Sequence, residues 1–184
     1  MEVEQIQPIE EQKEIPQESE TTIPEPAKKD AGADESKEDW ESLRFGLPED
    51  ECNETNYADW IANASAKSFN VTKGAITEIK SLANPPVKVA NMYSIVYYIL
   101  RKKNRAYEGK IMKGMFANPI EIVKEIQNFD YSTLTYKNCV VLKRKLEGES
   151  FEDTKKSSAA AAVLIDWALN LTKLRIVTGI YTET

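Results

Sequence analysis

Side chains that could carry out catalysis are sparse in this chain. It contains no histidine, and the carboxylates of Glu78 and Asp166 have no second acid at a spacing that supports acid–base chemistry. Cys52 and Cys139 lie too far apart for a zinc-ligand pattern, and Cys139 falls on an apolar helical stripe that favours a place in the core. We therefore expect no enzyme, no metal site and no cofactor.

The chemistry that remains is electrostatic. Residues 1–60 contain 19 acidic and 5 basic side chains, whereas residues 61–184 contain 11 acidic and 19 basic ones. The two net charges, −14 and +8, together give the −6 of the whole chain. An acidic segment joined to a basic body indicates an electrostatic partner. The densest basic runs, residues 101–105 and 143–145, could meet such a partner or the acidic residues of the chain itself.

The acidic segment, residues 1–54, is predicted to be a disordered tail. Four prolines interrupt any helix in its first part, and its isolated apolar residues cannot bury enough surface to offset the entropy of ordering. Its start has no basic and apolar signal, and the longest apolar run, residues 159–165, is too short to span a bilayer. We expect neither a signal peptide nor a membrane partner.

A short hydrophobic motif, residues 40–47, interrupts this tail. Its apolar side chains are those of Trp40, Leu43, Phe45 and Leu47. One interpretation packs the motif against its own domain. The other makes it a linear motif that docks on another protein, and the sequence leaves both open.

The elements that must position the basic residues are helices. From Tyr57 onward apolar residues recur at spacings of three and four, and no strand pattern of comparable strength occurs. The sequence predicts an all-α bundle of about six or seven helices over residues 55–184. The last helix is expected from about Asp153 to Arg175, with a short polar tail after it. The predicted core includes Ile79, Val89, Val96, Ile126, Leu142, Leu164 and Trp167.

One junction between helices is unusually specific. In "AITEIKSLANPP", residues 75–86, a helix ends because a residue before proline avoids the helical region, and Pro86 can then open the next helix. This stretch resembles the point in the dynein heavy chain where the stalk coiled coil enters the microtubule-binding domain. The family writes the junction as Ile-Thr-Glu-Ile-Lys-Ser, a few residues, and Pro-Pro.

The order of motifs after the junction resembles the same family over roughly residues 70–175. Tyr107 stands where the family usually has Trp, and "NPIEIVKEIQNFD" supplies an Asn, a helix and a Phe-Asp pair. The basic helix "NCVVLKRKLEG" and the Ala-rich "FEDTKKSSAAAAVLIDWALNL" follow. No Walker motif occurs, and the stalk helices would be short. The resemblance therefore implies a dynein-stalk-like head without motor or lever.

The resemblance also implies which side chains face tubulin. In the family, three elements face tubulin. They are the helix after the prolines, the helix that follows the short helix with the aromatic residue, and the start of the last helix. Carried over residue by residue, these positions are Lys88, Lys124, Lys155 and Lys156. Two departures weaken the match: Ala90 stands where the family commonly has lysine, and Asp166 stands where some members carry a base.

Together these features predict a non-catalytic microtubule-associated protein. Tubulin is acidic, so a basic body can be steered to it. The resemblance implies a structural component of ciliary axonemal microtubules in the cytoskeleton, with other axonemal proteins held through the N-terminal tail. Nucleic acid is not expected, because the whole chain is acidic and carries no known binding motif. The alternative is a helical adaptor that kept the fold but binds other proteins rather than tubulin.

Overall fold

The computed structural model describes residues 38–47, 51–66 and 71–182, and within them it contains helices and no strand. The all-α prediction is therefore confirmed. The elements are η1 (Glu41–Leu43), α1 (Tyr57–Ala66), α2 (Lys73–Ser81), α3 (Val87–Arg101), α4 (Gly109–Met115), α5 (Pro119–Gln127), η3 (Tyr131–Thr133), α6 (Tyr136–Leu146), α7 (Phe151–Lys155) and α8 (Ala159–Thr182). The predicted disorder of residues 1–37 lies outside the described residues.

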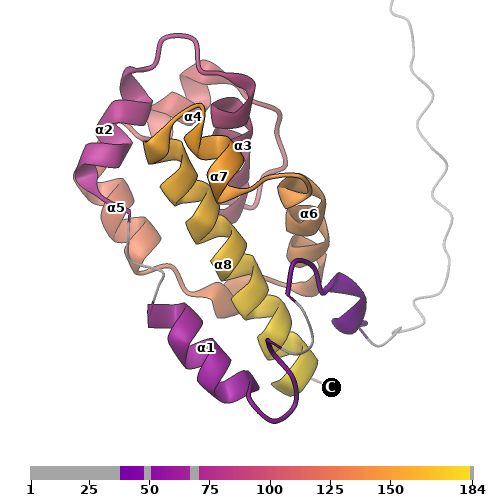
Figure 1. The fold of residues 1–184 in the computed structure, drawn as a ribbon. Coiled ribbons are helices and arrows are strands. Elements are labelled where there is room, and N and C mark those ends of the chain that lie inside the picture. The colour runs from indigo at the N-terminus through magenta and orange to yellow at the C-terminus, as the bar shows by residue number, and fades with distance from the viewer. Residues whose placement is uncertain (1–37, 48–50, 67–70, 183–184) are drawn as a thin grey trace, which may run out of the picture. The chain divides into compact units, whose positions relative to one another are not determined.

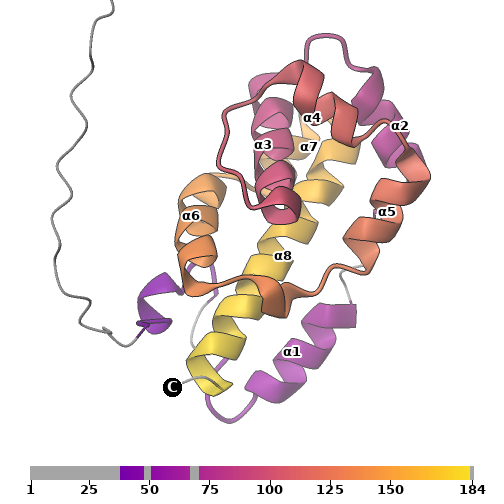
Figure 2. The same cartoon turned by 180° about the vertical axis from the view of Figure 1, so that it is seen from behind.

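Helix α8 is the central element of the bundle (Figures 1 and 2). It contacts α1, α2, α3, α6 and α7, and α1 lies beside its C-terminal half. Its buried residues include consecutive runs such as 160–162 and 174–177, so they lie on every side of the helix. A helix that is apolar all round needs neighbours all round. None of the described helices is long and apolar enough to cross a membrane.

The predicted core is confirmed. Each of its seven members is at most 3% exposed: Ile79, Val89, Val96, Ile126, Leu142, Leu164 and Trp167. Cys139 is also fully buried, as its place on an apolar stripe predicted. The Trp167 indole meets the ring of Phe129 edge-on at a centroid distance of 6.2 Å, which is a favourable aromatic geometry.

The predicted last helix is wrong at both ends. It divides into α7 and α8 around residues 156–158, because Ser158 caps α8 by accepting a hydrogen bond from the Ala161 amide (3.1 Å). At the other end α8 continues to Thr182, beyond the expected end at Arg175. Val177 and Ile180 are buried there, so tertiary packing extends the helix into residues 178–182, which were expected to belong to a polar tail.

The compact helical unit begins at Lys37 rather than at the predicted residue 55. Residues 38–47, called the strap below, belong to it: Trp40 is 2% exposed and Leu43 is 5% exposed. Trp40 meets Tyr136 of α6 edge-on at 5.3 Å, and the Arg175 guanidinium of α8 lies 4.2 Å from its ring centroid. These long-range contacts make the strap part of the core.

Candidate functional site

The candidate site is the end of the bundle that carries the α2–α3 junction, at the top of Figure 1. We call it the junction end, and it comprises residues 82–86, α4, α7, the linker 156–158 and the first turns of α3 and α5. Ser158 joins α8 to α2 by donating to the Glu78 carboxylate (3.3 Å). Lys80 of α2 donates to the Ala117 carbonyl just before α5 (2.9 Å). Side-chain hydrogen bonds therefore connect α2 to the start of α8 and to the residues just before α5.

The junction is held by donors from the two helices that follow it. The Tyr93 hydroxyl of α3 donates to the Ile79 carbonyl (3.0 Å), and Lys113 of α4 donates to the Leu82 carbonyl and to the Ala83 carbonyl (2.8 Å from the latter). The last carbonyls of a helix have no partner within it, and the two prolines supply no N–H. The bend in "AITEIKSLANPP" is therefore stabilised from outside the segment.

Lys88 is turned toward its own chain. Its Nζ donates to the Gly148 carbonyl and to the Glu149 carboxylate, each at 3.0 Å, and the Glu149 side chain is only 5% exposed. Asn91 donates to the same carboxylate at 2.8 Å. The pair ties the first turn of α3 to the connection between α6 and α7, so Lys88 must leave a largely buried partner before it can contact another protein.

Lys155 and Lys156 are exposed at the end of α7 and in the linker. The Lys156 ammonium contacts the Asp153 carboxylate at 2.7 Å, which holds the pKa of Asp153 below its ordinary value and raises the pKa of Lys156. Lys155 lies 5.5 Å from the centroid of the Phe151 ring. Both pairs are on the surface, where such contacts are weak and can be exchanged for a partner's carboxylates.

Lys124 lies apart from the other three predicted lysines. It is exposed on α5, and its neighbour Glu125 pairs with Arg101 at the last turn of α3. Lys88 is on the first turn of α3, and the helix rise separates these two ends by about 20 Å. The structure therefore brings Lys88, Lys155 and Lys156 toward one end and leaves Lys124 at a distance.

Apolar side chains on this surface were missed from the sequence. Val87, Ile111 and Ile120 are 76%, 39% and 50% exposed. Val87 and Ile120 each directly follow a proline at the start of a helix, where a side chain points away from the bundle. The pattern of proline followed by an apolar residue was the available signal. Apolar groups exposed at one end of a bundle can supply the dry centre of a contact with another protein.

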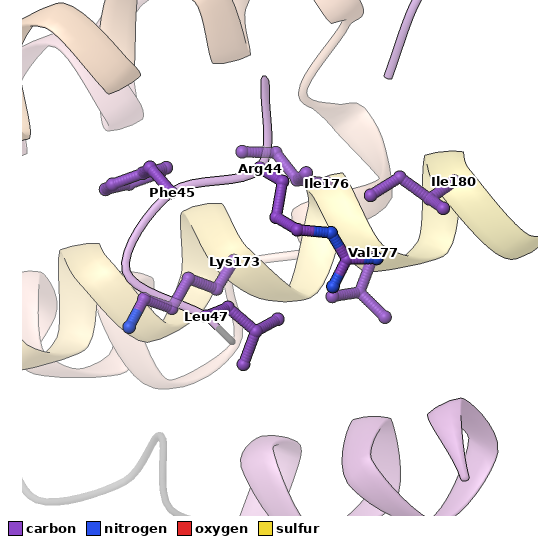
Figure 3. A pocket seen from close by; sticks show the side chains of 7 residues that line it. All are labelled: Arg44, Phe45, Leu47, Lys173, Ile176, Val177 and Ile180. Atoms are coloured by element: carbon purple, nitrogen blue, oxygen red, sulfur yellow. The ribbon is translucent and has the colours of Figure 1, made fainter. Parts of the chain in front are cut away.

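The strap forms a second site on α8. Figure 3 shows Arg44, Phe45 and Leu47 beside α8, whose facing residues are Lys173, Ile176, Val177 and Ile180. Cationic side chains hold the strap by its carbonyls: Lys143 donates to Ser42 (2.7 Å) and Lys173 to Gly46 (2.6 Å). Burial lowers the pKa of Lys173.

This packing is the first of the two alternatives for the hydrophobic motif. Trp40, Leu43 and Leu47 are buried against their own domain, and Phe45 is partly buried there. Docking of the motif on another protein would require the strap to leave α8, and that docking stays a prediction. No group of histidine, cysteine or acidic residues within the described part of the chain could hold a metal ion.

The fold and its ends define a small helical unit built around one central helix. No family model matches the chain. Over 119 residues it is 29% identical to the "Dynein alpha chain, flagellar outer arm" of Chlamydomonas reinhardtii. The match covers 61% of this chain and 3% of that much longer protein. The expected relation to dynein heavy chains is therefore supported as similarity to a short part of one.

Proposed function

We propose that this protein is a non-catalytic microtubule-binding protein whose dynein-stalk-like head contacts tubulin with its junction end. The observation that carries the proposal is the similarity to a dynein heavy chain over 61% of the sequence. The junction end supports it, because exposed lysines and exposed apolar groups lie together there. Charge can steer such a site to the acidic surface of a microtubule, and apolar contacts can then hold it there.

The four lysines differ in how much each is expected to contribute to tubulin binding. Lys155 and Lys156 are exposed and hold only surface partners, so they are available to tubulin. Lys88 is held by buried Glu149, and its main role is to fix α3 in place. Lys124 could contact tubulin only if the docked surface extends along α5. We therefore propose Lys155 and Lys156 as the principal electrostatic contacts, with Lys88 and Lys124 secondary.

Co-sedimentation of the full chain with microtubules, across a range of salt, tests the proposal. Binding should weaken with added salt, because exposed charges are screened over about 8 Å at physiological ionic strength. Lys155→Glu and Lys156→Glu should each weaken binding, and the double variant should weaken it about tenfold or more. Lys73→Glu makes the same charge change at the far end of α2 and should have little effect. The absence of sedimentation at low salt would exclude the proposal.

A structural role in cilia is the finer part of the proposal. The similar protein is a flagellar dynein by its name, and a head without a motor suits a permanent microtubule lattice. A tagged full-length chain expressed in a ciliated cell should remain on axonemes after detergent extraction. Loss of the protein with the soluble fraction would contradict this placement. Other axonemal proteins bound through the N-terminal tail remain a proposal, to be tested by cross-linking on the same axonemes.

The second candidate function is that of a helical adaptor. The observation that favours it is the internal pairing of Lys88 and Lys156, which reduces the free positive charge at the junction end. An adaptor would keep the fold, and its junction end would bind another protein. Failure of the full chain to bind microtubules, with the fold intact by circular dichroism, would make this the better interpretation.

A further inference from the structure

A second basic surface lies along α3 and adjoins the Lys88–Glu149 pair. The segment that connects α3 to α4, residues 102–108, runs back along α3 beside α6 (Figures 1 and 2). Ser94 of α3 links the two: its hydroxyl donates to the Arg105 carbonyl at 2.6 Å and accepts from Lys145 Nζ of α6 at 2.9 Å. Tyr98, one turn further along α3, accepts from Asn138 of α6 at 3.1 Å. The connection and α6 are therefore fixed on either side of Ser94.

Both borders of this surface are cationic. Lys103 and Arg105 are exposed on the connection, and Arg105 pairs with Glu108 at 3.1 Å. Lys137 and Arg144 are exposed on α6, seven positions apart, which places them on one face of the helix. No acidic residue occurs between Asp130 and Glu147 in the sequence, so the α6 border carries no internal counter-charge.

A shallow groove of about 290 Å³ opens between α3 and the end of α6. Its lining residues are Asn91, Ser94, Ile95, Arg144, Lys145, Glu147 and Glu149. Glu149 is already neutralised by Lys88, which leaves Arg144 and Lys145 against Glu147. Burial lowers the pKa of Lys145, so a negative ligand at this groove would favour its charged form. The Asn91 amide and the Ser94 hydroxyl in its lining already hold Glu149 and the Arg105 carbonyl, so the ligand contacts left to this groove are those of its cations.

We propose that this basic groove, bordered by residues 102–106 and by α6, binds an extended acidic peptide rich in glutamate. The cations stand on two separated borders, which suits a chain lying along α3 with carboxylates on alternate sides. Glu108 and Glu147 lie among these cations. Both would repel a nucleic acid, whose phosphates are evenly spaced along its backbone. A peptide can place its carboxylates beside the cations and keep them away from the two glutamates. We assign the acidic tails of tubulin as this peptide, and that assignment rests on the proposed function.

The direct test uses the full chain and a fluorescein-labelled polyglutamate peptide, with polyglutamine as the control peptide. Polyglutamate should bind, with an affinity that falls as salt is added. Lys103→Glu with Arg144→Glu should weaken binding about tenfold, and Lys73→Glu should not. Absence of polyglutamate binding, or equal loss with Lys73→Glu, would overturn the inference. Equally tight binding of a single-stranded oligonucleotide of the same charge would overturn the assignment to a peptide.

Microtubules before and after proteolytic removal of the acidic tubulin tails separate this inference from the proposed function. The Lys103 and Arg144 reversals should weaken binding to intact microtubules and leave binding to tail-less ones unchanged. The Lys155 and Lys156 reversals should weaken binding to both. If polyglutamate binds but microtubules do not, the proposed function fails and the groove stands. If intact and tail-less microtubules bind every variant alike, the groove assignment is wrong while the proposed function survives.

Discussion

Gly179 of α8 is where a single residue decides whether the strap can pack. A methyl group built at this position would lie inside the Trp40 indole, so only glycine leaves room for the ring. Alanine in place of a helical glycine usually stabilises by about 0.5–1 kcal/mol, but here the clash must displace Trp40 or bend α8. The pairing of a large aromatic with a glycine opposite it explains how the strap lies close to the helix.

We expect Gly179→Ala to lower the free energy of unfolding by about 1–3 kcal/mol, the usual cost of overpacking a core. Gly114→Ala in α4 is the matched control, because nothing lies within 4 Å of a methyl group there. It should leave stability unchanged or raise it by up to about 1 kcal/mol. Urea denaturation of both variants measures the difference. Equal stability of the two would mean that Trp40 does not lie against Gly179.

Tyr93 gives the junction a dependence on pH. The side chain is fully buried, its hydroxyl donates to the Ile79 carbonyl, and burial raises its pKa above the ordinary value of 10.0. Below about pH 10 the phenol is protonated in both states. Above that pH the unfolded chain loses this proton first, so the free energy of unfolding falls as pH rises.

Tyr93→Phe should therefore cost about 1 kcal/mol at neutral pH, through the lost hydrogen bond, and should decline less steeply above about pH 10. Urea titrations at several alkaline pH values measure the slope. Tyr131→Phe on η3, where the ring is only partly buried, serves as the comparison. A Tyr93→Phe variant that lost stability as steeply as the unsubstituted chain would show that Tyr93 does not contribute to the decline.

At the scale of elements, the sequence correctly predicted those features that depend on residues close together in the chain. Helix periodicity located the core residues, and the two prolines located the break between α2 and α3. The extension of α8 to Thr182 was missed because part of its cover comes from the strap, more than a hundred positions away in the chain. The Lys88–Glu149 pair was missed for the same reason. Residue type gives a lysine's charge, but only the fold shows which carboxylate already holds it.

The strap leads to a prediction about truncation. A fragment of residues 55–184 lacks Trp40, Leu43 and Leu47, each of which is at most 7% exposed. Burying one large apolar side chain contributes about 1.5–3 kcal/mol, and a domain of this size is stable by only about 5–15 kcal/mol. The fragment should unfold at a much lower temperature than residues 37–184, or without a cooperative transition. Thermal unfolding followed by circular dichroism compares the two, and equal midpoints would show that the strap is dispensable.

The whole molecule combines an acidic segment with a unit of opposite charge. Residues 1–36 contain 11 acidic and 3 basic side chains, a net charge of −8. The remaining residues contain 19 acidic and 21 basic side chains, a net charge of +2, which restores the −6 of the full chain. Net charge acts over distances longer than single contacts, so it governs the approach to an acidic polymer.

Removing residues 1–36 should therefore tighten and accelerate microtubule binding if the proposed function holds. The change from −6 to +2 replaces overall repulsion by attraction, and the effect should shrink as salt screens it. A full-length variant with the same acidic side chains changed to their amides separates charge from length, and it should behave like the deletion. Co-sedimentation at low and physiological salt measures both. Equal affinities of the deletion and the full chain at low salt would show that the acidic segment does not influence binding through its charge.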